Sequence, residues 1–102
     1  MDNFGLKKET LKKIIDVISA NKKVKKIILF GSRAKGNFQK GSDIDLVIIA
    51  PDLTFSEYLK ILTNLDELDI PYKIDLLHWN YLDEDIKEHI SRVGVEIYSY
   101  NH

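Results

Sequence analysis

The sequence contains no cysteine, which excludes disulfide bonds and cysteine-based zinc sites. It also has no apolar run close to the ~18 residues that a membrane-spanning helix needs. Its first five residues, Met-Asp-Asn-Phe-Gly, lack the apolar core of a secretory signal peptide. We therefore expect a cytoplasmic protein that does not enter a membrane.

Aromatic residues are few, at 10% of the chain, and they do not form the stacking platform of proteins that bind single-stranded nucleic acid. No direct nucleic-acid binding is expected. The histidines, His78, His89 and His102, lack the spacing of metal ligands, and we expect each of them to be structural or solvated.

One sign of charge is scarce in each part of the chain. Residues 1–40 have eleven Lys and Arg but only three Asp and Glu. Residues 41–102 have only four Lys and Arg but thirteen Asp and Glu. Such asymmetry is typical of a surface for phosphate or for an acidic partner, but solvated lysine-rich helix faces produce it too. Both interpretations remain open for most of these lysines.

The chain has 102 residues, of which 44% are hydrophobic, and this suits one domain with one core over residues 1–102. Apolar residues at helical spacing and a capping box at Thr54–Glu57 predict helices, and apolar β-branched runs predict strands. The expected helices cover 6–21, 55–68 and 82–93, with a helical turn at 33–37, and the expected strands cover 24–30, 44–49, 72–79 and 95–100. In the last helix, Ile86 and Ile90 are expected to face inward, and Gly94 to follow its end.

This order of elements indicates an α/β domain whose helices pack on one sheet. If Ser32 and Asp43 meet one ligand, the first strand must end where the second begins, so these two strands run antiparallel. The expected fold is therefore a mixed sheet of about four strands with helices packed on it.

The chain is organised around residues 31–46, GSRAKGNFQKGSDIDL. This stretch carries three glycines, two serines, three cationic side chains and two carboxylates between two strand-like runs. Asp43 and Asp45 are two residues apart, so at the start of a strand both side chains point to the same face. Two carboxylates on one face repel each other, and they are tolerated best if the face is wet or a divalent cation lies between them.

A third carboxylate, Asp75, lies within a strand-like run, Lys-Ile-Asp-Leu-Leu. An ionised carboxylate in a buried strand is costly unless it is paired or bound to a metal. Asp75 is therefore expected either to form a salt bridge, with Lys73 or a helix residue, or to join Asp43 and Asp45 at a metal.

Gly31-Ser32, followed after a fixed gap by Asp43 and Asp45, resembles the signature of the DNA polymerase beta-type nucleotidyltransferases. The chain is most similar to the minimal nucleotidyltransferases (MNT), short proteins that usually accompany a HEPN-domain partner in toxin–antitoxin pairs. Its length and the order of its apolar runs also fit, so the resemblance extends over nearly the whole chain. The family more often has arginine at the position of Lys35, and lysine lacks the bidentate fork of arginine.

The resemblance implies a small nucleotidyltransferase-fold domain and a metal-dependent transfer of a nucleoside monophosphate, with AMP from ATP expected, to a hydroxyl. Its catalytic and metal-binding residues would be Asp43, Asp45 and Asp75, whose carboxylates suit two Mg2+ ions. Asp75 would also accept the proton of the attacking hydroxyl. The residues expected to contact the nucleotide are Gly31, Ser32, Arg33 and Ser42.

The side chains expected at the nucleotide also have structural alternatives. Ser32 would cap a short helix after a turn glycine. Arg33 would be a surface charge, and Ser42 would order the start of the second strand.

The resemblance implies that the acceptor is a tyrosine of a HEPN toxin, which the modification silences, although nothing in the sequence itself names the acceptor. Two alternatives remain open: a non-catalytic antitoxin that acts by contact, and a transferase for a small-molecule hydroxyl. Larger family members carry extra substrate domains, for which this chain has no room. We therefore expect the acceptor surface to come from a partner or from a second copy of the chain.

Overall fold

The computed structural model describes residues 4–100, and His102 lies outside them. Each expected element is present, and the second strand has the bounds that the sequence predicts. The helices are α1 (Lys8–Ser19), α2 (Gly31–Lys35), α3 (Phe55–Asp66) and α4 (Glu84–Val93), with a 3-10 turn, η1 (Trp79–Tyr81), and the strands are β1 (Lys26–Phe30), β2 (Ile44–Ile49), β3 (Ile74–His78) and β4 (Val95–Ser99).

The four strands form one mixed sheet in the order β3-β2-β1-β4. Strand β1 runs antiparallel to both β2 and β4, whereas β2 and β3 are parallel. This confirms the expected α/β fold and the expected antiparallel arrangement of the first two strands. As a consequence, the end of β1 and the start of β2 lie at the same end of the sheet.

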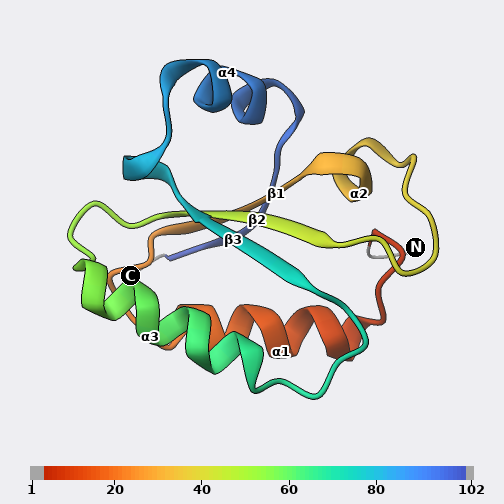
Figure 1. Ribbon diagram of the computed structural model, residues 1–102, viewed down its shortest axis with the longest axis horizontal. Coiled ribbons are helices and arrows are strands. Elements are labelled where there is room, and N and C mark those ends of the chain that lie inside the picture. The colour runs from red at the N-terminus through yellow and green to blue at the C-terminus, as the bar shows by residue number, and fades with distance from the viewer. Residues whose placement is uncertain (1–3, 101–102) are drawn as a thin grey trace.

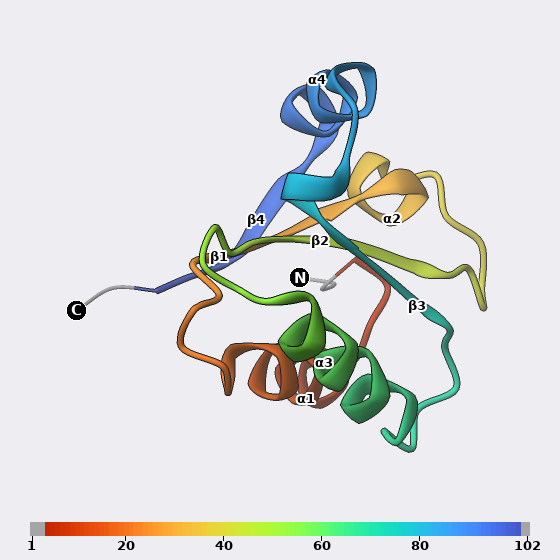
Figure 2. The same cartoon turned by 60° about the vertical axis from the view of Figure 1, so that its left-hand side comes forward.

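Helices cover both faces of the sheet: α1 and α3 lie on one face, and α2 and α4 lie on the other (Figures 1 and 2). The face toward α1 and α3 forms the main core, because alternate residues of each strand point to it. Its fully buried strand residues include Ile27, Leu29 and Leu46, which belong to one cluster with Ile14 and Ile18 of α1. None of the helices in the described part of the chain is both long and apolar enough to cross a membrane.

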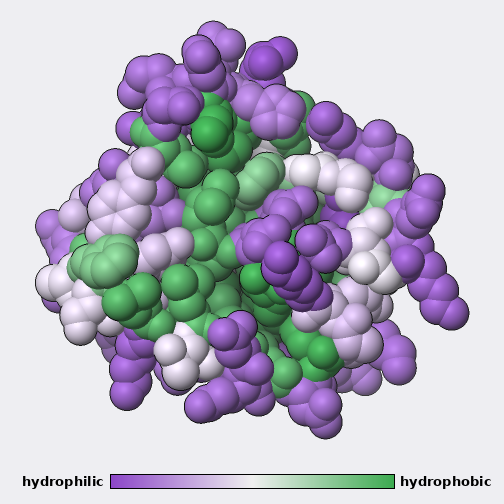
Figure 3. All heavy atoms as spheres, viewed as in Figure 1, coloured by the Kyte–Doolittle hydropathy of each residue, from purple (hydrophilic) through white to green (hydrophobic). Residues whose placement is uncertain are grey.

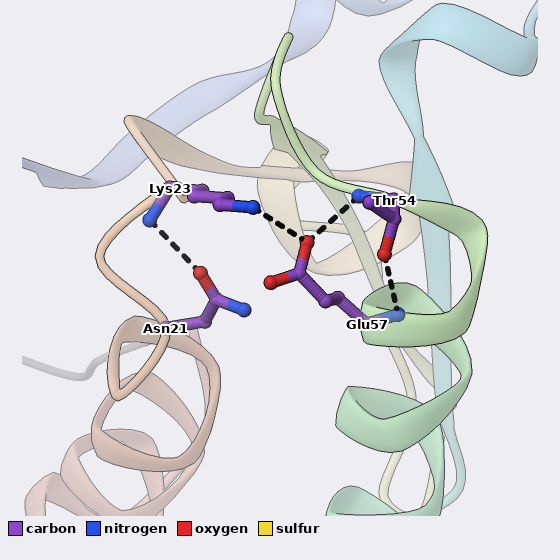
Figure 4. Close-up of polar contacts among 4 residues, drawn as sticks. All are labelled: Asn21, Lys23, Thr54 and Glu57. Atoms are coloured by element: carbon purple, nitrogen blue, oxygen red, sulfur yellow. Dashed lines mark hydrogen bonds and ion pairs between the residues drawn. The ribbon is translucent and has the colours of Figure 1, made fainter.

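The capping box predicted at the start of α3 is present (Figure 4). The Glu57 backbone N–H donates to the Thr54 hydroxyl at 3.1 Å, and the Thr54 N–H donates to the Glu57 carboxylate at 2.9 Å. The same carboxylate accepts from Lys23 at 3.0 Å, which connects α3 to the segment before β1. The Thr54 backbone N–H, followed by Lys23, lowers the pKa of Glu57 to about 2.

One expectation for α4 is wrong and one is confirmed. Ile90 is buried as expected, but Ile86 is 41% exposed, so the buried face of the helix is narrower than its sequence pattern indicates. Gly94 follows the end of the helix as expected, with a φ of −74°, so a left-handed conformation is not the reason for glycine here. A Cβ at Gly94 would lie 2.5 Å from Cγ2 of Ile28 and 2.6 Å from the carbonyl oxygen of Ile90. The residue is therefore small because α4 closely approaches β1.

Hydrophobic residues are also visible on the surface, in a band that runs from α4 across the middle of the sheet toward α3 (Figure 3). Within residues 4–100, the exposed large apolar side chains are Phe55, Leu59, Tyr81, Ile86 and Val95.

His78, at the end of β3, is a buried and therefore structural histidine. Its ring lies against the rings of Tyr81 and Tyr58, with centroids 4.5 and 5.6 Å apart. Nδ1 accepts from the Asn80 backbone N–H at 3.2 Å, which puts the proton of the neutral ring on Nε2. Nε2 is buried without a hydrogen-bond partner among the described residues, and burial lowers the pKa of His78.

We expect this burial to make the stability of the protein sensitive to acid. Below about pH 6.5, His78 of the unfolded chain takes up a proton that the folded chain does not bind, so the free energy of unfolding should fall. His78→Phe keeps an aromatic ring and should remove this part of the pH dependence. Chemical denaturation between pH 5.5 and 8 measures it, and the two proteins should differ by a constant amount above pH 7. If the free energy of unfolding of the two proteins falls equally below about pH 6.5, the acid sensitivity does not come from His78.

Candidate active site

The candidate site lies where β1 ends, α2 begins and β2 starts. Gly31 is the first residue of α2 and has a φ of +78°, a conformation that side chains rarely tolerate. A Cβ at Gly31 would also collide with Oδ2 of Asp45. The motif glycine and the second motif carboxylate are therefore direct neighbours, although fourteen positions separate them.

Asp45 lies in the middle of the site. In the sheet register it is opposite Phe30 of β1 and opposite Asp75 of β3. Because Ile44 and Leu46 point into the core, Asp45 points to the other face of the sheet, and Asp75 does so for the same reason. Burial raises the pKa of Asp45, and the charges of Asp75 and then Asp43 raise it further. The structure thus brings Asp43 and Asp75 close enough to Asp45 for their charges to act on its carboxylate.

Within residues 4–100, none of these three carboxylates takes part in a salt bridge. The alternative role of Asp75, an ion pair with Lys73 or with a helix residue, is therefore not found in the described part of the chain. The three side chains are nevertheless not arranged as a finished metal site: no group of three or more His, Cys, Asp or Glu residues in this part could hold an ion as it stands. The chemistry of the donors fits Mg2+, since all three are carboxylates, the ligands that this ion prefers in proteins.

Arg33 is not the surface charge that one interpretation of the sequence expects, since its exposed fraction is 2%. Its Nε and Nη2 donate to the carbonyl oxygen of Ser42, at 3.2 and 2.8 Å, and Nη1 donates to that of Phe4 at 2.8 Å. The rings of Phe38 and Tyr72 each lie 5.0 Å from the guanidinium carbon. A contact between Arg33 and a nucleotide stays a prediction. In the structure, its Nε, Nη1 and Nη2 donate to backbone carbonyl oxygens.

The two motif serines differ in their surroundings. Ser42 closes the turn before β2: its hydroxyl accepts from the Gln39 N–H at 2.9 Å, and its own N–H donates to the Gln39 carbonyl at 3.0 Å. It therefore orders the start of the strand. Ser32 lies in the first turn of α2 with a half-buried side chain, and Phe30, not Ser32, is the residue that precedes the helix. Ser32 is therefore not the helix cap that the structural alternative requires.

A hollow of about 330 Å³ lies elsewhere, between α1 and α3. Its lining includes Val17, Asn21, Lys60 and Asn64, and no predicted site residue. We assign no function to it, because it is on the opposite side of the sheet from the carboxylates.

Sequence reasoning missed three residues around the site: Phe4, Phe38 and Tyr72, which surround Arg33. They come from three different segments, and the hydrogen bond to Phe4 spans 29 positions. No local spacing pattern relates Phe4 or Tyr72 to Arg33, so the sequence alone carried no signal for these two residues. Phe38 lies within residues 31–46, five positions after Arg33, but its contact with the guanidinium was not predicted.

Comparison with known proteins shows what the chain resembles. A family model described as Polymerase beta, Nucleotidyltransferase matches residues 12–102. The chain is 42% identical over 69 residues to the probable protein adenylyltransferase MntA of Haemophilus influenzae, and the alignment covers 67% of this chain and 60% of that protein. It is 35% identical over 89 residues to a Methanocaldococcus jannaschii protein that is also named as a candidate protein adenylyltransferase, covering 79% and 88%.

Solved structures share the fold. A crystal structure of the toxin–antitoxin MntA–HpeT superposes with a TM-score of 0.70 at 18% identity, covering 94% of this chain and 76% of that one. A toxin–antitoxin with AMP-PNP gives 0.64 at 21% identity, covering 94% and 76%. A tri-AMPylated Shewanella oneidensis HEPN toxin in complex with MNT antitoxin gives 0.59 at 22% identity, covering 87% and 69%.

Proposed function

This chain belongs to the polymerase beta nucleotidyltransferase family, and we propose that it transfers an adenylyl group from ATP to a hydroxyl of a partner protein. The observation that carries the proposal is the placement of Gly31, Asp45 and Asp75. A positive-φ glycine lies against one carboxylate, and a second carboxylate faces it across the parallel strands. Clustered, unpaired carboxylates destabilise a fold unless they bind something, so a site for catalysis explains them better than a surface for contact alone.

Asp43, Asp45 and Asp75 would hold Mg2+, which neutralises phosphate oxygens and supports in-line transfer when it is bound. Other residues of the chain would bind the nucleotide, and Asp75 would also accept the proton. Gly31 allows the backbone to approach a phosphate, and Ser32 offers it a hydroxyl and an N–H. In the reaction the acceptor oxygen bonds to the α-phosphorus, the bond to pyrophosphate breaks, and the hydroxyl proton passes to Asp75.

We further propose that ATP is the donor of the adenylyl group and that a HEPN-domain protein is the acceptor. Both assignments are supported by the names of the two relatives and by the solved neighbours, one with AMP-PNP and one with an AMPylated HEPN toxin. We propose a tyrosine of the HEPN partner as the acceptor, and a cytoplasmic location, where ATP is available. The basic N-terminal part and the loop of residues 36–43 are proposed to face that partner.

The test is to incubate the protein with a HEPN-domain partner and Mg-ATP and to weigh the partner by intact-protein mass spectrometry. We expect the partner to gain ~329 Da, the mass of one adenylyl group, or multiples of it, because each transfer leaves AMP on the acceptor. Peptide mapping should locate the adduct on one tyrosine.

The Asp43→Asn protein is the control, since it should give no adduct. If the partner is neutralised without any gain in mass, and Asp43→Asn neutralises it equally well, the chain acts as a contact antitoxin. An adduct on an added small molecule, with the protein partner unmodified, would instead favour the small-molecule transferase.

A further inference from the structure

Arg33 connects three separate segments from a buried position. Its guanidinium donates to the carbonyl of Ser42 in the motif loop and to that of Phe4 in the N-terminal segment. It also lies between the ring of Phe38 in the same loop and the ring of Tyr72 in the segment before β3. The start of the described chain indeed runs beneath the loop that follows α2 (Figure 1).

The way in which this charge is compensated is specific to arginine. Within residues 4–100, Arg33 forms no salt bridge, so the cost of burying its charge is offset by carbonyl oxygens and two ring faces. A lysine places a point charge at the end of a flexible stem and cannot donate in a planar fork to two carbonyls. The backbone at Gly5 also closely approaches the guanidinium, since a Cβ at Gly5 would lie 3.0 Å from Nη1 of Arg33.

The segments that Arg33 connects are those that carry the carboxylates. Ser42 directly precedes Asp43, so its carbonyl belongs to the peptide unit that leads into the first carboxylate. Tyr72 leads into β3 and Asp75, and the neighbouring Lys73 carbonyl accepts from the Ile44 N–H at 2.9 Å. The guanidinium therefore lies between the two chain segments that determine how the carboxylates face each other.

We propose that Arg33 is a positioning residue: by holding Ser42, Phe4 and Tyr72 together, it fixes the spacing of Asp43 and Asp45 relative to Asp75. The inference rests on the proposed function, because it assigns the three carboxylates to one metal-dependent site. It differs from the direct phosphate contact that the sequence suggests, since Nε, Nη1 and Nη2 of Arg33 each donate to a backbone carbonyl. It also makes the N-terminal segment at Phe4 a part of the site's support.

The first experiment measures how much Mg2+ is needed for ATP binding, by calorimetry on the full chain. Arg33→Lys keeps the charge but loses the fork, and it should raise the half-saturating Mg2+ concentration by about 10–100-fold, the usual effect of residues that orient metal ligands. ATP affinity at saturating Mg2+ should stay near that of the parent. Tyr72→Leu should act in the same direction, and adding it to Arg33→Lys should have less than an additive effect. Arg92→Lys, at an exposed position of α4, is the matched control.

The second experiment needs no nucleotide and follows amide hydrogen exchange in the free protein. In Arg33→Lys, the amides of Ser42 and Ile44 should exchange at least ~10-fold faster, because local opening of the loop becomes easier, while amides in the middle of β1 and β2 keep their rates. A general loss of stability would instead accelerate exchange throughout the sheet.

The outcomes separate the proposals. If ATP affinity falls in Arg33→Lys even at saturating Mg2+ and Tyr72→Leu has no effect, Arg33 contacts phosphate and the positioning role is wrong. Unchanged exchange at Ser42 and Ile44 would overturn it too, as would faster exchange everywhere with an unchanged Mg2+ requirement. If the parent protein itself binds no Mg-ATP, the proposed function fails, and the positioning of the loop is then decided by exchange alone.

Discussion

Replacing Asp43 and Asp45 together by asparagine should abolish the metal dependence of ATP binding and reduce adenylyl transfer to background. Both substitutions remove a negative charge from the face of β2 that Asp75 shares, and an amide is a poor ligand for Mg2+ compared with a carboxylate. The proposed transfer depends on metal-held phosphates, so we expect a loss of at least ~10³-fold. Titration of Mg-ATP by calorimetry and the mass assay on the partner measure the two effects.

Loss of folding would also abolish binding and transfer, and the melting temperature of the double variant tests for it. Burial, Asp75 and Asp43 raise the pKa of Asp45, so its charged form opposes folding, and this unfavourable contribution grows as the pH rises through the unfolded pKa. The double variant should therefore melt no lower than the parent at pH 7. Asp52→Asn with Asp69→Asn, two exposed carboxylates elsewhere, makes the same change in net charge and should leave ATP binding unchanged. Unaltered Mg-ATP binding by Asp43→Asn/Asp45→Asn would sink the metal-site assignment.

Asp75→Asn should separate binding from chemistry. With Asp43 and Asp45 still present, nucleotide binding should be largely retained, but the proton of the attacking hydroxyl loses its acceptor. Such a loss typically lowers the rate by 10²–10⁴-fold. Transfer of radiolabel from α-labelled ATP to the partner, measured beside ATP affinity, reports both quantities.

Two controls make this result interpretable. Asp69→Asn changes an exposed carboxylate before β3 and should transfer at the parent's rate. The melting temperature of Asp75→Asn should not fall, since the asparagine relieves repulsion with Asp45. A near-normal rate of transfer by Asp75→Asn would leave Asp75 with a structural role only.

The parts of the fold that the sequence predicts best depend on local physics. The capping box at Thr54 and Glu57 is formed by residues three apart, so the start of α3 could be recognised without any tertiary contact. The bounds of β2 follow from an apolar run that ends at Pro51. The antiparallel arrangement of β1 and β2 followed from requiring that Ser32 and Asp43 share one end of the sheet.

The sequence predicts least well where the surroundings of a residue depend on contacts with distant segments of the chain. Ile86 fits the apolar stripe of α4 as well as Ile90 does, but the residues that pack against the helix cover only Ile90. Gly94 follows α4 as predicted, but the structure shows a reason for glycine that the sequence does not: a Cβ there would meet Ile28 of β1. A helical pattern specifies a face, but not how much of that face the neighbouring layer covers.

For the candidate site, the sequence by itself determined which carboxylates, glycine and serines lie near one another in the motif, because spacing within one strand or turn sets their faces. That Asp75 lies beside Asp45 required the parallel register of β2 and β3, and the catalytic roles of these residues stay predictions. Only the tertiary structure decided the environment of Arg33, which a sequence presents as one more cation in a basic stretch. Its partners Phe4 and Tyr72 lie 29 and 39 positions away, and such contacts exist only after the chain has folded around it.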